Sequence, residues 1–117
     1  MSENSRPYRS LVGNATDVLA QKGYTTLKHC SIFSKNNEDC WLHLYNAAAV
    51  ADVAVGTTAP DQSYAVATSD NTAYVMTDIN LHDGLRFDLG LVFAVTKELD
   101  GGATAPDSNC VVNLGIS

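Results

Sequence analysis

The sequence predicts an all-β protein: an antiparallel β-sandwich or barrel, jelly-roll or Greek-key-like, with about eight strands. Apolar residues recur with period two, whereas a helical period is hard to find over any window longer than about ten residues. The candidate strands are short, and runs rich in Gly, Pro, Asp and Asn separate them. A chain of 117 residues has the size of one domain with a modest core.

The first residues predict an arm that precedes this domain. Residues 1–10 are polar and include Arg6 and Arg9, so we expect a flexible N-terminal arm there and a single sandwich domain over residues 11–117. Val12 and residues 18–20 could add one or two strands near the start of the domain.

A hairpin is expected next along the chain. Residues 28–33 and 40–45 have strand character and flank the sequence Ser-Lys-Asn-Asn-Glu-Asp, which is rich in turn formers and charges. Pairing across this loop would place Phe33 opposite Cys40 and Cys30 opposite His43.

Five later segments have strand character as well: 63–67, 73–81, 85–87, 91–96 and 110–116. In the last two segments, alternate apolar residues share one face, which should be core: Leu91, Phe93 and Val95, and Cys110, Val112, Leu114 and Ile116. The glycines Gly84 and Gly90 bracket residues 85–89, where each allows a sharp bend, a bulge or the close approach of another backbone.

Residues 46–60 allow two interpretations. Asn46 could cap a short helix through the alanine-rich stretch 47–52, with Gly56 ending it. That helix would be short to stand alone, and the valines of this segment favour an extended chain. Gly56 can supply a positive φ, the two threonines after it can bond backbone groups and Pro60 fixes the exit, so the sequence predicts a rigid turn.

The charge pattern argues against several partners. Seven scattered basic residues against thirteen acidic ones give a formal net charge of −6, and binding to a phosphate backbone needs clustered cations. We therefore expect no nucleic-acid or membrane partner. Without an apolar stretch after the first charges or a long apolar run, we expect synthesis in the cytoplasm.

No pattern predicts chemistry. The three cysteines Cys30, Cys40 and Cys110 lack CxxC spacing, and we expect them to be buried free thiols. The histidines and nearby aspartates do not place two metal ligands within one turn, namely His29, His43, His82, Asp78, Asp83 and Asp88. No activated nucleophile is recognisable, so we expect no catalytic residue, metal or cofactor.

The strand over residues 40–45 has two apolar or amphipathic faces. Trp41, His43 and Tyr45 lie on one face, while Cys40, Leu42 and Leu44 lie on the other. We expect the second face to join the core and the first to meet a neighbouring subunit. Two alternatives are a core formed within the chain and an aromatic platform for sugars that also uses Tyr64 and Tyr74.

Five segments carry a resemblance to a known class of protein: 44–47 (LYNA), 55–60 (VGTTAP), 63–67 (SYAVA), 84–91 (GLRFDLGL) and 111–114 (VVNL). Their order and spacing resemble those of small virion structural proteins of tailed bacteriophages, over residues 27–116. An Arg would be more typical of these proteins at the position of His43, so a contact made by that Arg is not expected here.

The resemblance implies a non-enzymatic protein of the virion. It favours a capsid decoration, or cement, protein that binds the major capsid protein as a homo-oligomer, with a trimer favoured. Arg6 and Arg9 are candidates for contacts with an acidic capsid surface, and Trp41, His43 and Tyr45 for subunit contacts. The alternatives are a tail, neck or fibre module and a carbohydrate-binding receptor module.

Overall fold

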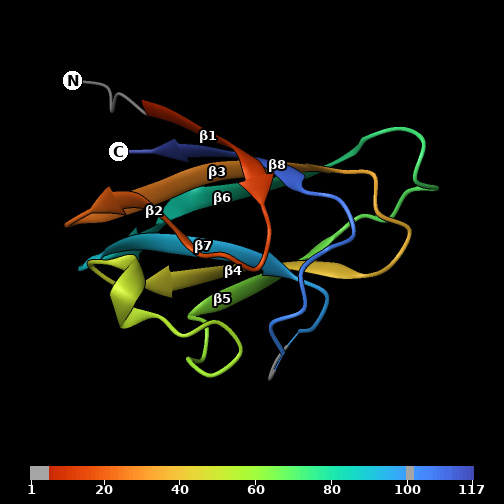
Figure 1. Ribbon diagram of the computed structural model, residues 1–117. Coiled ribbons are helices and arrows are strands. Elements are labelled where there is room, and N and C mark those ends of the chain that lie inside the picture. The colour runs from red at the N-terminus through yellow and green to blue at the C-terminus, as the bar shows by residue number, and fades with distance from the viewer. Residues whose placement is uncertain (1–5, 100–101) are drawn as a thin grey trace.

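The structure is a computed structural model that describes residues 6–99 and 102–117. Within those ranges the chain forms eight strands and one short 3₁₀ turn, η1 (Val50–Asp52), and Figure 1 shows the strands in two layers. In chain order the strands are β1 (Arg6–Gly13), β2 (Val18–Lys22), β3 (Thr25–Ser34), β4 (Cys40–Asn46), β5 (Gln62–Val66), β6 (Val75–Phe87), β7 (Gly90–Thr96) and β8 (Cys110–Ile116).

The two layers are four-stranded antiparallel sheets, with strand orders β1-β8-β3-β6 and β2-β7-β4-β5. The pairs β1·β8, β2·β7, β3·β6 and β4·β5 are nested one inside the next along the chain. Nested antiparallel pairs that alternate between two sheets form a jelly roll. The predicted all-β sandwich is therefore confirmed, including its strand number.

The core lies between the sheets and is apolar. Both expected core faces are confirmed, because the alternate apolar residues of β7 and of β8 belong to one buried cluster. β4 contributes Cys40, Leu42 and Leu44 to the same cluster, as its alternation predicted. All three cysteines are free and buried, so the prediction for them is confirmed as well.

The predicted hairpin of β3 and β4 is wrong. β3 pairs with β6 and β8 in one sheet, whereas β4 pairs with β5 and β7 in the other. Residues 35–39 therefore cross from one sheet to the other instead of reversing within a sheet. The buried Asn36 fixes this crossing, since its side chain accepts a hydrogen bond from the Ser108 backbone N–H and donates one to the Ser108 carbonyl.

Part of the predicted arm is a strand. Residues 6–10 belong to β1, and Tyr8 reaches the core, where its ring meets the Phe93 ring edge-on at 5.9 Å. Pro7 is tolerated because β1 lies at the edge of its sheet. Residues 1–5, the rest of the predicted arm, lie outside the described residues.

The two predicted strands over residues 73–81 and 85–87 form one long strand, β6, interrupted by a bulge. Residues 81–84 lie opposite the single residue Lys28 of β3, and Gly84 ends the bulge with φ +82°. Gly90 begins β7 with φ +146°, at the point where two other segments come close. Both glycines thus have the roles that the sequence predicted.

The segment after β4 contains η1, whose N-cap is Ala49 rather than Asn46, and then a turn at residues 55–57. The Asn46 side chain instead accepts a hydrogen bond from the Leu89 backbone N–H. In the described ranges, no helix has the length and hydropathy needed to cross a membrane.

Candidate functional site

The outer face of β4 is covered by the chain itself. Tyr45 is 2% exposed and packs with Val53, Val92 and Ala94 in a second buried cluster. Val53 comes from the long connection between β4 and β5, which runs beneath the lower sheet in Figure 1 (yellow-green). The double cover predicted for β4 is present, but this connection supplies it where a neighbouring subunit was expected.

The connection is held in place by its turn. Gly56 has φ +89°, and the Thr57 and Thr58 N–H groups both donate to the Ala54 carbonyl. The Thr58 hydroxyl in turn accepts a hydrogen bond from the Ala54 N–H at 2.9 Å. A positive φ and a threonine bonded to the backbone give the rigid turn that the sequence predicted.

His43 is buried under this cover and fully hydrogen bonded. Its Nε2 lies 3.0 Å from the Glu98 carbonyl oxygen, which can only accept, so Nε2 carries the proton. Its Nδ1 then accepts from the Ser63 hydroxyl at 2.7 Å. Burial lowers the pKa of His43 below its usual value, against the opposing effect of the Glu98 carbonyl. The ring is therefore neutral at pH 7.

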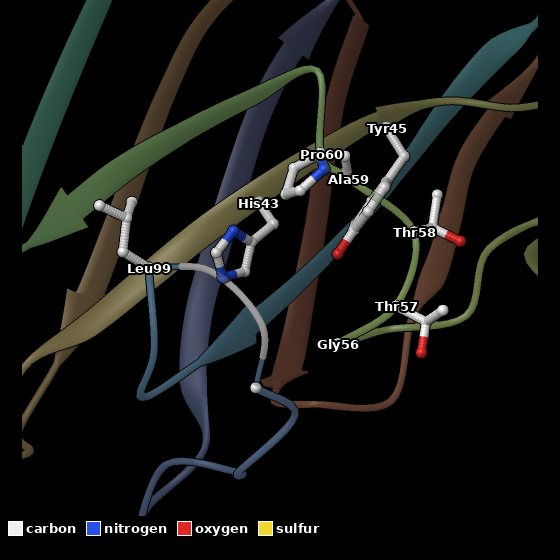
Figure 2. A pocket seen from close by; sticks show the side chains of 9 residues that line it. His43, Tyr45, Gly56, Thr57, Thr58, Ala59, Pro60 and Leu99 are labelled. Atoms are coloured by element: carbon white, nitrogen blue, oxygen red, sulfur yellow. The ribbon is translucent and has the colours of Figure 1, made fainter.

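A pocket of about 170 Å³ lies over the side chains of His43 and Tyr45. Figure 2 shows the His43 and Tyr45 rings on β4 with the turn 56–60 beside them, and Leu99 and Gly102 complete the lining. Both His43 nitrogens are engaged, and burial followed by the charge of Asp17 raises the pKa of Tyr45. Neither side chain is thus a ready acid or base near pH 7.

The aromatic platform considered for sugars is not assembled. Trp41 is half-buried on the outer face of β4, where its register partners are Ala65 and Thr96. Tyr45 is buried, and Tyr64 packs against the core on the opposite face of the sheet. Tyr74 belongs to the connection before β6, where the Lys35 ammonium lies 5.4 Å from the centre of its ring.

Within the described residues, no segment covers the outer face of the other sheet, which we call the open face. Its strand register aligns the outward residues in three rows across the order β1, β8, β3, β6. The polar row is Arg9, Asn113, Ser31 and Asp78, the apolar row is Leu11, Val111, Phe33 and Met76, and the third row is Pro7, Gly115, His29 and Asn80. Leu11 lies at a bulge, because the register of β1 and β8 shifts between Ser10 and Gly13 and leaves Leu11 and Val12 together opposite Val111.

The apolar row is accessible. Leu11 is 64% exposed and Met76 52%, and the neighbouring Val12 and Tyr74 are 53% and 50% exposed. Exposed apolar side chains that gather in one place and have a polar rim mark an interaction surface. The sequence did contain a signal for this row, since Phe33 and Val111 lie beside core residues and so break the alternation of apolar and polar positions.

The predicted interface residues therefore divide between two places. Arg9 is exposed on the open face and donates through Nε to the Asn113 side chain at 2.8 Å, and Arg6 begins the same strand. Trp41 is half-buried on the other sheet, where His43 and Tyr45 are buried under the chain's own turn. As interface candidates, only Arg6, Arg9 and Trp41 keep accessible surface in the single chain.

The histidines and aspartates considered for a metal are not gathered. His29 lies 2.5 Å from Asp78 between Nε2 and Oδ1, while His43 is in the other sheet. Among residues 6–99 and 102–117, no three His, Cys, Asp or Glu side chains lie close enough to hold a metal ion.

Comparisons of the chain with protein-family models, curated proteins and solved structures gave no match.

Proposed function

We propose that this chain is a non-enzymatic structural protein of a tailed-phage virion, and that it decorates the assembled head by binding the major capsid protein. The observation that carries the proposal is the open face. It is a four-stranded surface with an exposed apolar row and a polar rim, which suits contact with another protein better than chemistry on a small molecule.

The fold supports this class of function. Eight-stranded jelly rolls serve in viral capsid proteins, lectins and cupins. Here the space between the sheets is filled by apolar side chains such as Leu27, Ile32 and Phe93, and the four aromatic residues considered for a sugar platform do not form one surface. Those two features suit a structural subunit better than a cupin or a lectin.

The charge distribution supports it too. The strands of the open-face sheet carry four basic residues and two acidic ones, whereas the rest of the chain has three basic and eleven acidic. The sheet that bears the open face is thus less acidic than the rest of the chain, so an acidic protein meets less repulsion on that side. Arg6 and Arg9 remain our candidates for contacts with an acidic capsid surface.

The mechanism is linkage between binding and assembly. A subunit that binds only the expanded, assembled shell stabilises that state by mass action, and attachment as an oligomer adds avidity. No covalent step is needed.

The test uses virions of the phage whose genome encodes the chain. We expect quantitative mass spectrometry of purified particles to find the protein in a copy number comparable with that of the major capsid protein. A few copies per particle would instead indicate a tail, neck or fibre module, and its absence from the particle would overturn the proposal.

A binding experiment tests whether the protein decorates the head surface or is present in the particle for another reason. Purified protein added to expanded heads that lack it should bind and raise their melting temperature, because it binds the expanded state alone. Unexpanded heads are the control. Equal binding to both kinds of head would contradict the mechanism.

A further inference from the structure

The charges and apolar side chains of the open face are complementary to those of the same face on a second copy of the chain. The polar row begins with the positive Arg9 on the edge strand β1 and ends with the negative Asp78 on the other edge strand, β6. Three strand spacings, about 14 Å, separate these strands, so the two charges lie far apart within one chain. The Asp78 side chain is 54% exposed although its Oδ1 lies 2.5 Å from His29 Nε2, and Arg9 is exposed although its Nε donates to Asn113.

A twofold axis parallel to the strands, passing between β8 and β3, places the opposite charges of two copies against each other. It turns a second copy so that β1 faces the partner's β6 and β8 faces the partner's β3, while each row keeps its position along the strands. Arg9 then faces the partner's Asp78, and Asp78 faces the partner's Arg9. The apolar row meets the apolar row of the other copy. An axis across the strands would instead place the apolar row against the row of Pro7 and His29.

The shape of the face fits the same arrangement. A hollow of about 200 Å³ lies among Arg9, Phe33, Tyr74 and Val111, and Val111 is the position that faces the partner's Phe33. A wider hollow of about 480 Å³ includes Gly115, which faces the partner's His29. Each large side chain of β3 thus meets a small residue and a hollow on β8.

We propose that the open face binds a second copy of this chain, with the two sheets stacked about a twofold axis parallel to their strands. Aligned stacking of this kind is a usual packing of two sheets. It also brings together two chains of net charge −6 through their least acidic side. The charge pattern favours a twofold pair over the trimer that the resemblance favoured, and the inference does not depend on a role in a virion. Because the pair covers the open face, self-association competes with the capsid binding proposed above.

The size of the face sets the expected strength. Strands about 4.8 Å apart and rows about 6.8 Å apart give roughly 400 Å² for the three rows. A standard stable interface buries about 800 Å² on each partner. Self-association should therefore depend on concentration, and sedimentation velocity over a series from micromolar to millimolar protein is the appropriate measurement.

Charge reversal tests the pairing. Arg9→Glu places two carboxylates together at each contact and Asp78→Arg places two cations together, so each change alone should weaken dimerisation at least about tenfold. The double variant restores opposite charges at both contacts and should recover the wild-type dissociation constant to within about threefold. Lys22→Glu, on β2 of the other sheet, is the matched control and should change nothing.

Mixing the two single variants tests the symmetry. In a mixed dimer, the carboxylate introduced by Arg9→Glu in one chain faces the guanidinium introduced by Asp78→Arg in the other. At the second contact, the unchanged Asp78 of the first chain faces the unchanged Arg9 of the second. The mixture should therefore associate where neither variant does alone. A heterologous contact or a trimer does not predict this recovery in both contacts at once.

Gly115→Trp gives an independent test that does not depend on charge. A Cβ at Gly115 would meet only ordinary contacts, the nearest being the His29 Cβ at 3.7 Å, so the fold should tolerate the change. The indole would fill the hollow that receives the partner's His29 and should abolish the dimer, with circular dichroism confirming the fold.

The proposal is overturned if the wild-type protein stays monomeric throughout the series, or forms a trimer. Failure of the double variant and of the mixture to recover association would also overturn it. Head binding is measured separately, so a dimer that does not bind heads would contradict the proposed function alone.

Discussion

At the scale of single residues, the burial of His43 makes the stability of the fold depend on pH. Its neutral ring is the form that the Ser63 hydroxyl and the Glu98 carbonyl accommodate, and burial lowers its pKa below 6.5. The unfolded chain therefore takes up the proton first on acidification. Its contribution to stability is complete above about pH 6.5 and is lost as the pH falls below that value.

We expect His43→Gln to remove this pH dependence. A glutamine amide can donate to the Glu98 carbonyl and accept from Ser63 without titrating. Urea unfolding at several pH values between 7.5 and 5 should show the wild-type stability falling by at most about 1.4 kcal/mol per pH unit, with a flatter profile for the variant.

Equal slopes for the two proteins would contradict this assignment. Two carboxyl groups with lowered pKa values titrate below this pH range, because hydrogen bonds from Thr72 and Thr104 lower the pKa values of Asp70 and Glu98 below their usual 3.8 and 4.5. Their effects therefore begin at lower pH.

At the scale of elements, alternation along the chain predicted which face of a strand each residue lies on, but not which strands pair with one another. The inward residues of β4, β7 and β8 were all predicted correctly, because alternation depends only on local geometry. The pairing of β3 with β4 was wrong, because a polar segment of that length can either reverse a strand or cross between sheets. Long-range contacts decide between the two, namely the pairing of β3 and β4 with strands of different sheets and the hydrogen bonds of Asn36 with Ser108.

The same limit applied to the candidate site. Parity placed Trp41, His43 and Tyr45 on one face of β4 correctly, but no local pattern indicates how far residues 47–61 fold back over that face. The open face was missed for a related reason. Its rows join β1, β8, β3 and β6, which lie far apart in sequence, so no single segment contains them.

Gly90 tests how tightly elements meet at the start of β7. A Cβ there would lie 2.6 Å from the Ala47 carbonyl oxygen and 2.8 Å from that of Gln21, in addition to the strain of φ +146°. We expect Gly90→Ala to cost at least about 3 kcal/mol of unfolding free energy.

Gly23→Ala is the matched control. It has φ +83° but open space around a new Cβ, so it should cost only about 1 kcal/mol. Chemical denaturation of both variants makes the comparison, and equal losses would mean that the close approach at Gly90 has no energetic weight.

At the scale of the whole molecule, the reactivity of the three cysteines shows whether the core unfolds as one cooperative unit. Burial raises the pKa of Cys30 to about 12 and that of Cys40 to about 11, and it raises the pKa of Cys110 as well. They lie on β3, β4 and β8, all in the one core between the sheets. The reactive thiolate is therefore scarce and shielded in the folded protein.

We expect all three thiols to be labelled at one common rate in low urea, equal to that of global unfolding, because no cysteine can be exposed without separating the sheets. Mass spectrometry of partly labelled protein should find unlabelled and triply labelled chains only. A singly labelled population would instead show that one part of the core opens alone.

The nested pairing has a consequence for how the chain is made. Tyr8 pairs with Leu114, near the two ends of the sequence, whereas β4 pairs with the next strand, β5. Closing the longest loop costs the most entropy, so pairing proceeds outward from β4 and β5 and ends with β1 and β8. During translation β1 must wait, without its only strand partner, until β8 has left the ribosome. The sandwich is therefore completed only once β8 is available, and until then β1 is an unpaired edge that chaperones can bind.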